Sequence, residues 1–405
     1  MKMTGRERSV SMSEISLFMS PEQTIFGRDS AKEVGKYAKL LGAGKVFVVT
    51  DEIIVGLEPF KAVEKSLKDA NLDYYVYAEV DQNPTDLQIE NGARLYKEEK
   101  ADLLLSIGGG SSIDSAKAIG ILADNPGSIR DYACNYITGM DSNPMNNANP
   151  IPPLITIPTT AGTGSEVGAW VVVTNTKDNY KFFAGGWNCL PRVAIVDPVM
   201  TSTMPPSLTA DTGIDALCHA IEAYCTPYGM PQADVFALEA IKLVVKHLGP
   251  AVADGSNIDA REGMAMGALQ AGLAMNAGCG GIHALGLQLT SKYGIPHGRT
   301  LAIMMPGVMR YNLIACVDRF VDIAKAMGEK VEGLSQMEAA EKAPFAVEQF
   351  AQSIGIKTTL SKETEDPELI PICAKHALEN ENIHGNPCMP TLEEVEELYK
   401  QAYNK

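Results

Sequence analysis

The segment DLLLSIGGGSSIDSAKAIG, residues 102–120, constrains the fold of this chain more strongly than any other. It begins as an apolar run typical of a buried strand. Three glycines, Gly108, Gly109 and Gly110, follow, and Ser111 then opens a helical pattern. Glycine lets an anion approach the backbone closely, and the free amides at a helix N-terminus attract phosphate. Although the spelling is neither G-x-G-x-x-G nor a P-loop, the segment favours a phosphate-binding turn for a dinucleotide over a tight turn with a serine cap.

Strand and helix patterns alternate through the first half of the chain. Apolar, β-rich runs followed by helical spacing imply a parallel sheet with crossover connections. The expected strands are 45–50, 73–80, 102–107, 153–158, 169–175 and 192–197, with helices at 59–71 and 85–99.

After residue 202 the pattern becomes almost continuously helical. Because 405 residues exceed the size at which one hydrophobic core stops growing, two domains are expected. We predict a flexible N-terminal extension at 1–17, an α/β domain with a Rossmann-like parallel sheet at 18–202, and an all-α domain at 203–405. The expected helices of the last domain are 208–225, 231–247, 260–277, 281–293, 299–327, 336–354, 367–379 and 391–403.

Charge and cysteine usage limit the partners and the compartment. A net charge of −16 opposes binding to nucleic acid or an anionic membrane, because both repel an acidic protein. The uncharged stretch 263–291 could span a bilayer, yet Asn276, His283 and Gln288 would be costly in lipid, so we expect buried helices there. Eight scattered cysteines without a CxxC pair favour a reducing cytoplasm, and argue against a disulfide framework and a thiolate zinc site. The N-terminus has no apolar core of signal-peptide length, which also favours a cytoplasmic protein.

Four residues have the character of metal ligands. Asp215 and His219 are four apart, and on a helix they share one face and can bind one cation. His283 and His297 would complete the site from a later helix and the turn after it. Each histidine alone could be a buried hydrogen-bonding residue or a helix cap, but the set of four favours a metal site. Cys218, which lies between the first two ligands, is expected to point away from their face.

Two further polar segments fit a dinucleotide. Asp51 follows the strand at 45–50, where a doubly wound fold places a carboxylate against the adenosine ribose, favouring NAD over NADP. A helix cap is an equal alternative for this residue. The loop IPTTAGTGSEV, residues 157–167, could form a wall for the nicotinamide and its phosphate with the hydroxyls of Thr159, Thr160 and Thr163. A hairpin-like loop would have a similar sequence.

From about Phe18 to its C-terminus, the chain resembles the iron-containing (group III) alcohol dehydrogenases. The resemblance rests on GGGSSIDSAK at 108–117, PTTAGTGSEV at 158–167, DALCHAIEAY at 215–224, and IHALGLQL with PHG at 282–298. It implies a dehydroquinate synthase-like fold, in which the α/β domain binds the dinucleotide, the helical domain binds the metal and the active site lies in the cleft between them.

The resemblance also assigns residues. The family's metal ligands, for which Fe²⁺ is expected and Zn²⁺ is the second choice, fall on Asp215, His219, His283 and His297. Its cofactor contacts fall on Asp51, Asn83, Gly109, Gly110, Ser111, Thr159, Thr163 and Lys181, to which we add Gly108, Asp114 and Thr160 from the same two loops.

Three departures from the family pattern concern the substrate. A histidine often assigned to proton relay is Leu287 here, Trp170 should shorten the pocket, and Cys388 stands where the family often has arginine. A short pocket suggests a substrate of only a few carbons. Arg299 and Lys181 leave room for an anionic group on that substrate, unless they serve the cofactor phosphates or lie at the surface.

These observations predict an NAD(H)- and metal-dependent oxidoreductase that interconverts a small primary alcohol, a short diol or an anionic hydroxyalkyl compound and its aldehyde. The resemblance implies a homodimer or a larger homo-oligomer. Two alternatives stay open: a non-redox enzyme that uses the same metal, cofactor and fold, and an impaired family member with a role in an assembly.

Overall fold

The structure is a computed structural model that describes residues 16–134, 143–177 and 180–404. Most of the predicted flexible extension, residues 1–15, therefore lies outside the described residues. Residue contacts divide the chain into two compact units, one of residues 19–204 and one of residues 205–405, which also includes the described residues 16–18. The ring of Phe18 stacks on that of Phe236 in the second unit, with centroids 5.8 Å apart.

The first unit contains a six-stranded sheet in which every neighbouring pair of strands is parallel. The strand order is β1-β8-β5-β4-β2-β3. The strands are β1 (Gln23–Phe26), β2 (Lys45–Val49), β3 (Asp73–Tyr77), β4 (Leu103–Gly108), β5 (Leu154–Pro158) and β8 (Val193–Val196). The predicted doubly wound α/β domain is confirmed.

Two strands of this unit differ from the expectation. The strand expected at 169–175 is β6 (Trp170–Asn175), but it pairs antiparallel with β7 (Tyr180–Gly185) in a separate two-stranded sheet. Neither β7 nor the short edge strand β1 was predicted. β1 has only four residues, QTIF, none of them fully buried, so it lacks the apolar run that marks the central strands.

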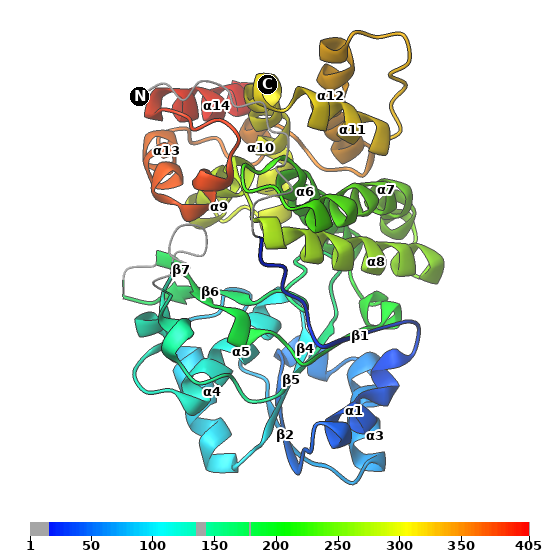
Figure 1. Cartoon of the computed structure of the whole chain (residues 1–405), viewed down its shortest axis with the longest axis vertical. Coiled ribbons are helices and arrows are strands. Elements are labelled where there is room, and N and C mark those ends of the chain that lie inside the picture. Colours follow the sequence, from blue (N-terminus) through cyan, green and yellow to red (C-terminus); the bar gives the residue numbers. More distant parts are fainter. Residues whose placement is uncertain (1–15, 135–142, 178–179, 405) are drawn as a thin grey trace. The chain divides into compact units, whose positions relative to one another are not determined.

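Helices cover both faces of the parallel sheet. Successive side chains of a strand point to opposite faces, so each buried strand contributes apolar side chains to both. Phe47 and Val49 of β2 belong to one apolar core and Val46 and Val48 to the other. Figure 1 shows α1 (Val34–Leu40) and α3 (Glu58–Asp69) on one side, and α4 (Asp86–Glu99) and α5 (Gly110–Asp124) on the other. The shorter helices are α2 (Glu52–Val55) and the 3-10 turns η1 (Ser30–Glu33), η2 (Ile129–Tyr132), η4 (Pro144–Asn147), η5 (Trp187–Cys189) and η6 (Pro198–Thr201).

All the regular secondary-structure elements of the second unit in the described residues are helices, as predicted. Its α-helices are α6 (Pro206–Cys225), α7 (Pro231–Ala253), α8 (Ile258–Ala274), α9 (Gly281–Tyr293), α10 (His297–Asn312), α11 (Val317–Ala326), α12 (Gln336–Ser353), α13 (Ile370–Glu379) and α14 (Leu392–Asn404). Its 3-10 turns are η7 (Met275–Ala277), η8 (Leu313–Ala315), η9 (Leu360–Lys362) and η10 (Glu381–Gly385).

The single helix expected at 299–327 is wrong, because two helices, α10 and α11, occupy that range with η8 between them. At the break the buried side chain of Asn312 exchanges two hydrogen bonds with the side chain of Asn386, at 2.8 and 2.9 Å. Helical periodicity is a local signal, so it could not reveal this contact between residues far apart in the chain.

The helix α6 lies at the centre of the second unit. It packs against α7, α8 and α10, and nearly all of its residues from Thr209 to Tyr224 are buried. A helix enclosed in this way can present polar side chains to a site shielded from water. No helix in the described ranges is long and apolar enough to cross a membrane.

Candidate metal centre and cofactor loops

Three polar residues of α6 are aligned because of their spacing. Asp215, His219 and Glu222 stand at positions i, i+4 and i+7 of one helix, so they share one face. All three are buried, which is unusual for charged and imidazole side chains unless they have a partner or a ligand.

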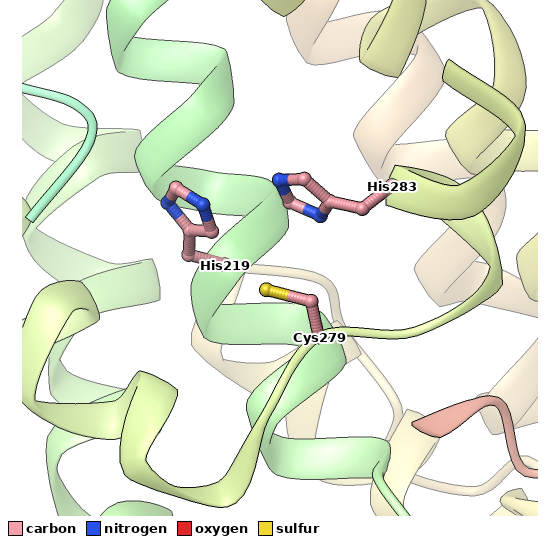
Figure 2. A group of neighbouring side chains, drawn as sticks. All are labelled: His219, Cys279 and His283. Carbon is pink, nitrogen blue, oxygen red and sulfur yellow. The ribbon is translucent and has the colours of Figure 1, made fainter. Parts of the chain in front are cut away.

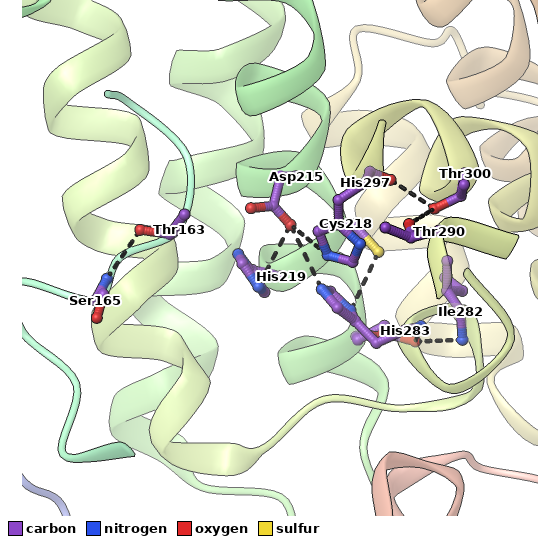
Figure 3. A network of polar contacts seen from close by, with 11 residues as sticks. Thr163, Ser165, Asp215, Cys218, His219, Ile282, His283, Thr290, His297 and Thr300 are labelled. Carbon is purple, nitrogen blue, oxygen red and sulfur yellow. Dashed lines mark hydrogen bonds and ion pairs between the residues drawn. The ribbon is translucent and has the colours of Figure 1, made fainter. Parts of the chain in front are cut away.

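The two other predicted ligands reach Asp215 from α9 and α10. One oxygen of Asp215, Oδ1, lies 3.6 Å from Nε2 of His219, 3.5 Å from Nε2 of His283 and 3.6 Å from Nε2 of His297. Figure 3 shows the three imidazoles around this carboxylate, and the rings of His219 and His283 are stacked with centroids 4.6 Å apart. The structure therefore brings all four predicted ligands together.

Gly298 explains how His297, the first residue of α10, comes so close to α6. A Cβ atom at position 298 would overlap the backbone carbonyl of Asp211, one turn before Asp215. Only glycine permits this approach of two backbones. The carbonyl of His297 also accepts a hydrogen bond from the hydroxyl of Thr300 at 2.7 Å.

The electrostatics of Asp215 suit a cation. Burial would raise the pKa of this carboxyl, but the charge of His219 and the contacts with His283 and His297 outweigh burial and hold the pKa well below its ordinary value. Neither Asp215 Oδ1 nor His283 Nε2 has a hydrogen bond within the described part of the chain, although both are buried. Because buried polar atoms are rarely left without a partner, these two atoms fit a bound metal ion. One carboxylate and three imidazoles match the donor preferences of divalent transition metals.

Glu222 contacts Nδ1 of His283, and this role of Glu222 was not predicted from the sequence. Its Oε2 lies 2.5 Å from Nδ1 of His283, while its Oε1 accepts the backbone amides of Ile282 at 2.6 Å and His283 at 3.3 Å. A carboxylate on the far nitrogen of a metal-binding histidine fixes the ring and leaves the near nitrogen for the metal. The spacing of three residues after His219 was the available signal for this role.

Cys218 does not point away from the site as expected. Its sulfur lies 3.6 Å from Nδ1 of His283. Three residues advance a helix by about 300°, so Cys218 stands only about 60° around the helix from Asp215, and α9 approaches from that side. Burial lowers the pKa of His283, but the interactions with Cys279, Cys218, Glu222 and Asp215 outweigh burial and raise this pKa well above its usual value.

The proposed cofactor loops lie at the carboxyl ends of the parallel strands in the first unit. The amide of Thr159, directly after β5, donates to the carbonyl of Gly108 at the end of β4 over 2.9 Å. A Cβ on Gly110 would lie 2.8 Å from Cγ2 of Thr163, and one on Gly109 would lie 3.3 Å from Cγ2 of Thr160. The glycines therefore allow the two predicted motifs to meet at the N-terminus of α5, where free amides attract phosphate.

Asp51 caps a helix, which was the alternative predicted for this residue. Its Oδ1 accepts the backbone amides of Ile53 and Ile54, both at 2.9 Å, at the start of α2. Its other oxygen, Oδ2, lies 3.9 Å from the position that a Cβ on Gly108 would take. One oxygen is thus used by the fold and the other faces the glycine loop, so contact with a ribose stays a prediction.

Hydrogen bonds connect other members of the predicted cofactor set to one another or to a neighbouring residue in the chain. Lys181 of β7 donates to Oδ1 of Asn83 at 2.7 Å, and burial lowers the pKa of this lysine. The hydroxyl of Ser111 donates to the carbonyl of Gln82 at 2.6 Å. These bonds join three separate segments, at residues 82–83, at Ser111 and at Lys181.

Asp114 holds the threonine loop in place. Its carboxylate accepts the hydroxyl of Ser165, and its Oδ2 accepts the amide of Val172 at 2.9 Å. The amide of Ser165 donates in turn to the hydroxyl of Thr163 at 3.3 Å, as drawn in Figure 3. Asp114 therefore positions the loop, and its predicted contact with the cofactor stays untested.

The predicted substrate residues are distributed over both units. Trp170 begins β6 and is half-buried, and Leu287 is half-buried on α9, one turn after His283. Cys388 follows η10, and its carbonyl accepts a bond from the side chain of Asn386 at 2.6 Å. Arg299 was expected to leave room for an anionic substrate, but it forms ion pairs with Asp211 at 3.2 Å and with Glu363 at 3.6 Å. Two carboxylates neutralise this guanidinium, so it offers little support for an anionic substrate.

Comparisons with known proteins match most of the chain. The family description "Iron-containing alcohol dehydrogenase" matches residues 21–198, and "Fe-containing alcohol dehydrogenase family, C-terminal" matches residues 209–403. The 1,3-propanediol dehydrogenase of Citrobacter freundii is 40% identical over 392 residues, which cover 95% of this chain and 98% of that protein.

Two further relatives extend the match. The NAD-dependent methanol dehydrogenase of Bacillus methanolicus is 39% identical over 386 residues, covering 95% of this chain and 99% of that protein. A crystal structure of a 1,3-propanediol oxidoreductase has a TM-score of 0.91 at 37% identity, and the match covers 96% of this chain and 100% of that one.

Proposed function

The chain belongs to the iron-containing alcohol dehydrogenase family, and from this we propose that it is a metal-dependent NAD(H) oxidoreductase that interconverts a small primary alcohol or short diol and its aldehyde. The observation that carries the proposal is the convergence of three imidazole nitrogens on one oxygen of Asp215, at 3.5 to 3.6 Å. The names of its relatives support the substrate class, since they refer to a short diol and to methanol.

The residues of the chain prepare this chemistry in defined ways. Asp215, His219, His283 and His297 would hold a divalent cation, which would supply a Lewis acid for the alcohol or aldehyde oxygen, and a bound nicotinamide would supply the hydride chemistry. Asp215 contributes a full negative charge, because its pKa lies well below the ordinary value. Oε2 of Glu222 accepts a hydrogen bond from the Nδ1–H of His283, which leaves the Nε2 lone pair directed at the site. Leu287 offers no proton-transfer group, so we propose that proton exchange uses water or the cofactor ribose.

Within this proposal the metal is Fe²⁺, with Zn²⁺ as the second choice, and the cofactor is NAD(H) in preference to NADP(H). An N₃O donor set accepts either metal, and the family description supports iron. The carboxylate of Asp51 supports NAD(H), because it would repel a 2′-phosphate near the glycine loop.

The proposal also includes a cytoplasmic homodimer or larger homo-oligomer. The eight cysteines, all within the described residues, form no disulfide bond, which suits a reducing compartment. Light scattering of the purified protein would measure the oligomer size, and a monomer would contradict this part.

The test of the function combines elemental analysis with turnover. Protein purified without oxygen should contain a divalent metal, and it should oxidise NADH in the presence of short aldehydes, including hydroxyaldehydes and anionic aldehydes in the same panel. His283→Ala should abolish metal retention, whereas His384→Ala should not, because His384 is exposed on η10. Full metal content without turnover of any aldehyde would contradict the redox function, and full metal content in His283→Ala would contradict the ligand set.

A further inference from the structure

Cys279 lies beside the proposed metal centre, and the sequence offered no reason to place it there. It stands between η7 and α9, four residues before His283. Figure 2 shows its sulfur turned toward the imidazoles of His219 and His283. The three residues are 9%, 7% and 4% exposed, respectively, so this group is shielded from water.

The three side chains are close enough for one metal ion. Each offers one ligand atom, and these atoms all lie within 4.8 Å of one another. Zinc bonds of about 2.3 Å to sulfur and about 2.0 Å to nitrogen would place such atoms about 3.5 Å apart around one tetrahedral ion. His219 and His283 also lie 3.6 and 3.5 Å from Oδ1 of Asp215, so the carboxylate and the sulfur both lie next to the same pair of imidazoles.

The backbone around Cys279 is held in place by close packing. A Cβ on Gly385 would overlap the carbonyl of Cys279, and a Cβ on Gly281 would lie 2.7 Å from Oδ1 of Asn386. The amide of Gly281 donates to the same oxygen at 3.2 Å. Glycines at both contact points let η10 clamp this segment, and a rigid segment keeps a side chain at its site.

A second sulfur near the centre is less suited to the same role. Cys218 faces Nδ1 of His283, at 3.6 Å, and Glu222 already lies 2.5 Å from that nitrogen. A metal ion bound to Nε2 of His283 would therefore lie on the opposite side of the ring from Cys218, which is on the same side as Glu222.

We propose that the thiolate of Cys279 is an additional ligand of the metal ion, together with His219 and His283. The inference rests on the metal centre of the proposed function and defines its donor set more closely. Thiolate is a soft ligand, so the mixed donor set binds Zn²⁺ and Co²⁺ more strongly, relative to Mn²⁺, than oxygen and nitrogen donors alone. Under this proposal the sulfur ligand comes from a loop rather than from a CxxC pair, which is the pattern whose absence argued against a thiolate site.

The test replaces the bound metal with Co²⁺, whose absorption reports sulfur ligation through a charge-transfer band in the near ultraviolet. The wild type should show this band. Cys279→Ser and Cys279→Ala should lose it while binding cobalt with the same stoichiometry. Cys218→Ala is the matched control and should keep the band. Retained cobalt binding and an unchanged far-ultraviolet circular dichroism spectrum would establish that each variant is folded.

A second measurement compares metal affinities. Cys279→Ala should weaken Zn²⁺ binding by about tenfold or more, the lower limit for loss of a residue that supports a metal site, with a smaller effect on Mn²⁺. Equal losses for the two metals would contradict sulfur ligation.

The possible failures can be told apart. If the wild type binds cobalt but lacks the band, or if Cys279→Ala keeps it, Cys279 is no ligand and the metal centre still stands. If the wild type binds no cobalt, or if His283→Ala binds it equally well, the metal centre itself is wrong and the inference falls with it.

Discussion

Oε2 of Glu222 and Nδ1 of His283 are 2.5 Å apart, although 60 residues lie between them in the chain. Both side chains are buried, and Glu222 also accepts the amides of Ile282 and His283 at the start of α9. One carboxylate of α6 thus sets both the entry of α9 and the orientation of its metal-binding ring.

Glu222→Gln should weaken metal binding by about 10–100-fold, because the amide would bond His283 Nδ1 less strongly and would no longer balance the charge of the site. Metal affinity measured by competition with a chelator checks this. Glu239→Gln on α7 is the control, since Glu239 is exposed and pairs only with Lys242 in the described structure. An affinity equal to that of the wild type would show that Glu222 serves the fold alone.

Gly298→Ala should displace the N-terminus of α10, because a Cβ there would overlap the carbonyl of Asp211. We expect a loss of about 1–3 kcal/mol in stability, typical of overpacking, and metal retention as poor as that of His297→Ala. Thermal unfolding and elemental analysis measure the two effects. Gly307→Ala in the same helix is the control, since its Cβ would lie 3.8 Å from the nearest atom, Cδ2 of Leu398. Normal metal content in Gly298→Ala would refute the argument.

Asp51→Asn separates the two roles of Asp51. The amide keeps an oxygen that can cap α2 but removes the negative charge, so the preference for NADH over NADPH should fall while the melting temperature changes little. Asp51→Ala should lose the same preference and also about 1 kcal/mol from the missing cap. The ratio of kcat/KM values for the two cofactors is the readout. A ratio that is unchanged in Asp51→Asn would leave Asp51 with the cap alone.

Glu166 should make stability depend on pH. Burial raises the pKa of this carboxyl from its ordinary value of 4.5 to about 7, against the opposing effects of its own backbone and Lys117. Since the folded pKa is the higher one, the contribution to stability is fully present below about pH 4.5 and is lost as the pH rises through about 7. The shift corresponds to a loss on the order of 3 kcal/mol.

Glu166→Gln should therefore melt at a higher temperature than the wild type at about pH 8, and at a similar temperature at about pH 5, because the amide does not ionise. Glu90→Gln, at an exposed position of α4, controls for the general loss of one negative charge. A parallel pH dependence in Glu166→Gln and the wild type would mean that another group is responsible.

The helices and strands that were predicted correctly were predicted from local sequence patterns. α9 was expected at 281–293 and occupies Gly281–Tyr293, because its apolar spacing and flanking glycines are local signals. The break after α10 and the antiparallel pairing of β6 escaped prediction. The break coincides with the hydrogen bonds between Asn312 and Asn386, and the pairing of β6 depends on a partner strand that the pattern did not reveal.

By itself, the sequence determined the two kinds of domain, the glycine turn before α5, and the pairing of Asp215 with His219 on one helix. Each of these depends on residues a few positions apart, whose spacing sets their geometry. Only the tertiary structure decided that Glu222 supports His283, that Gly298 allows His297 to reach Asp215, and that Cys279 lies beside the same histidines. Those relationships join helices and loops that are distant in the chain, and only close packing of the folded backbone brings them together.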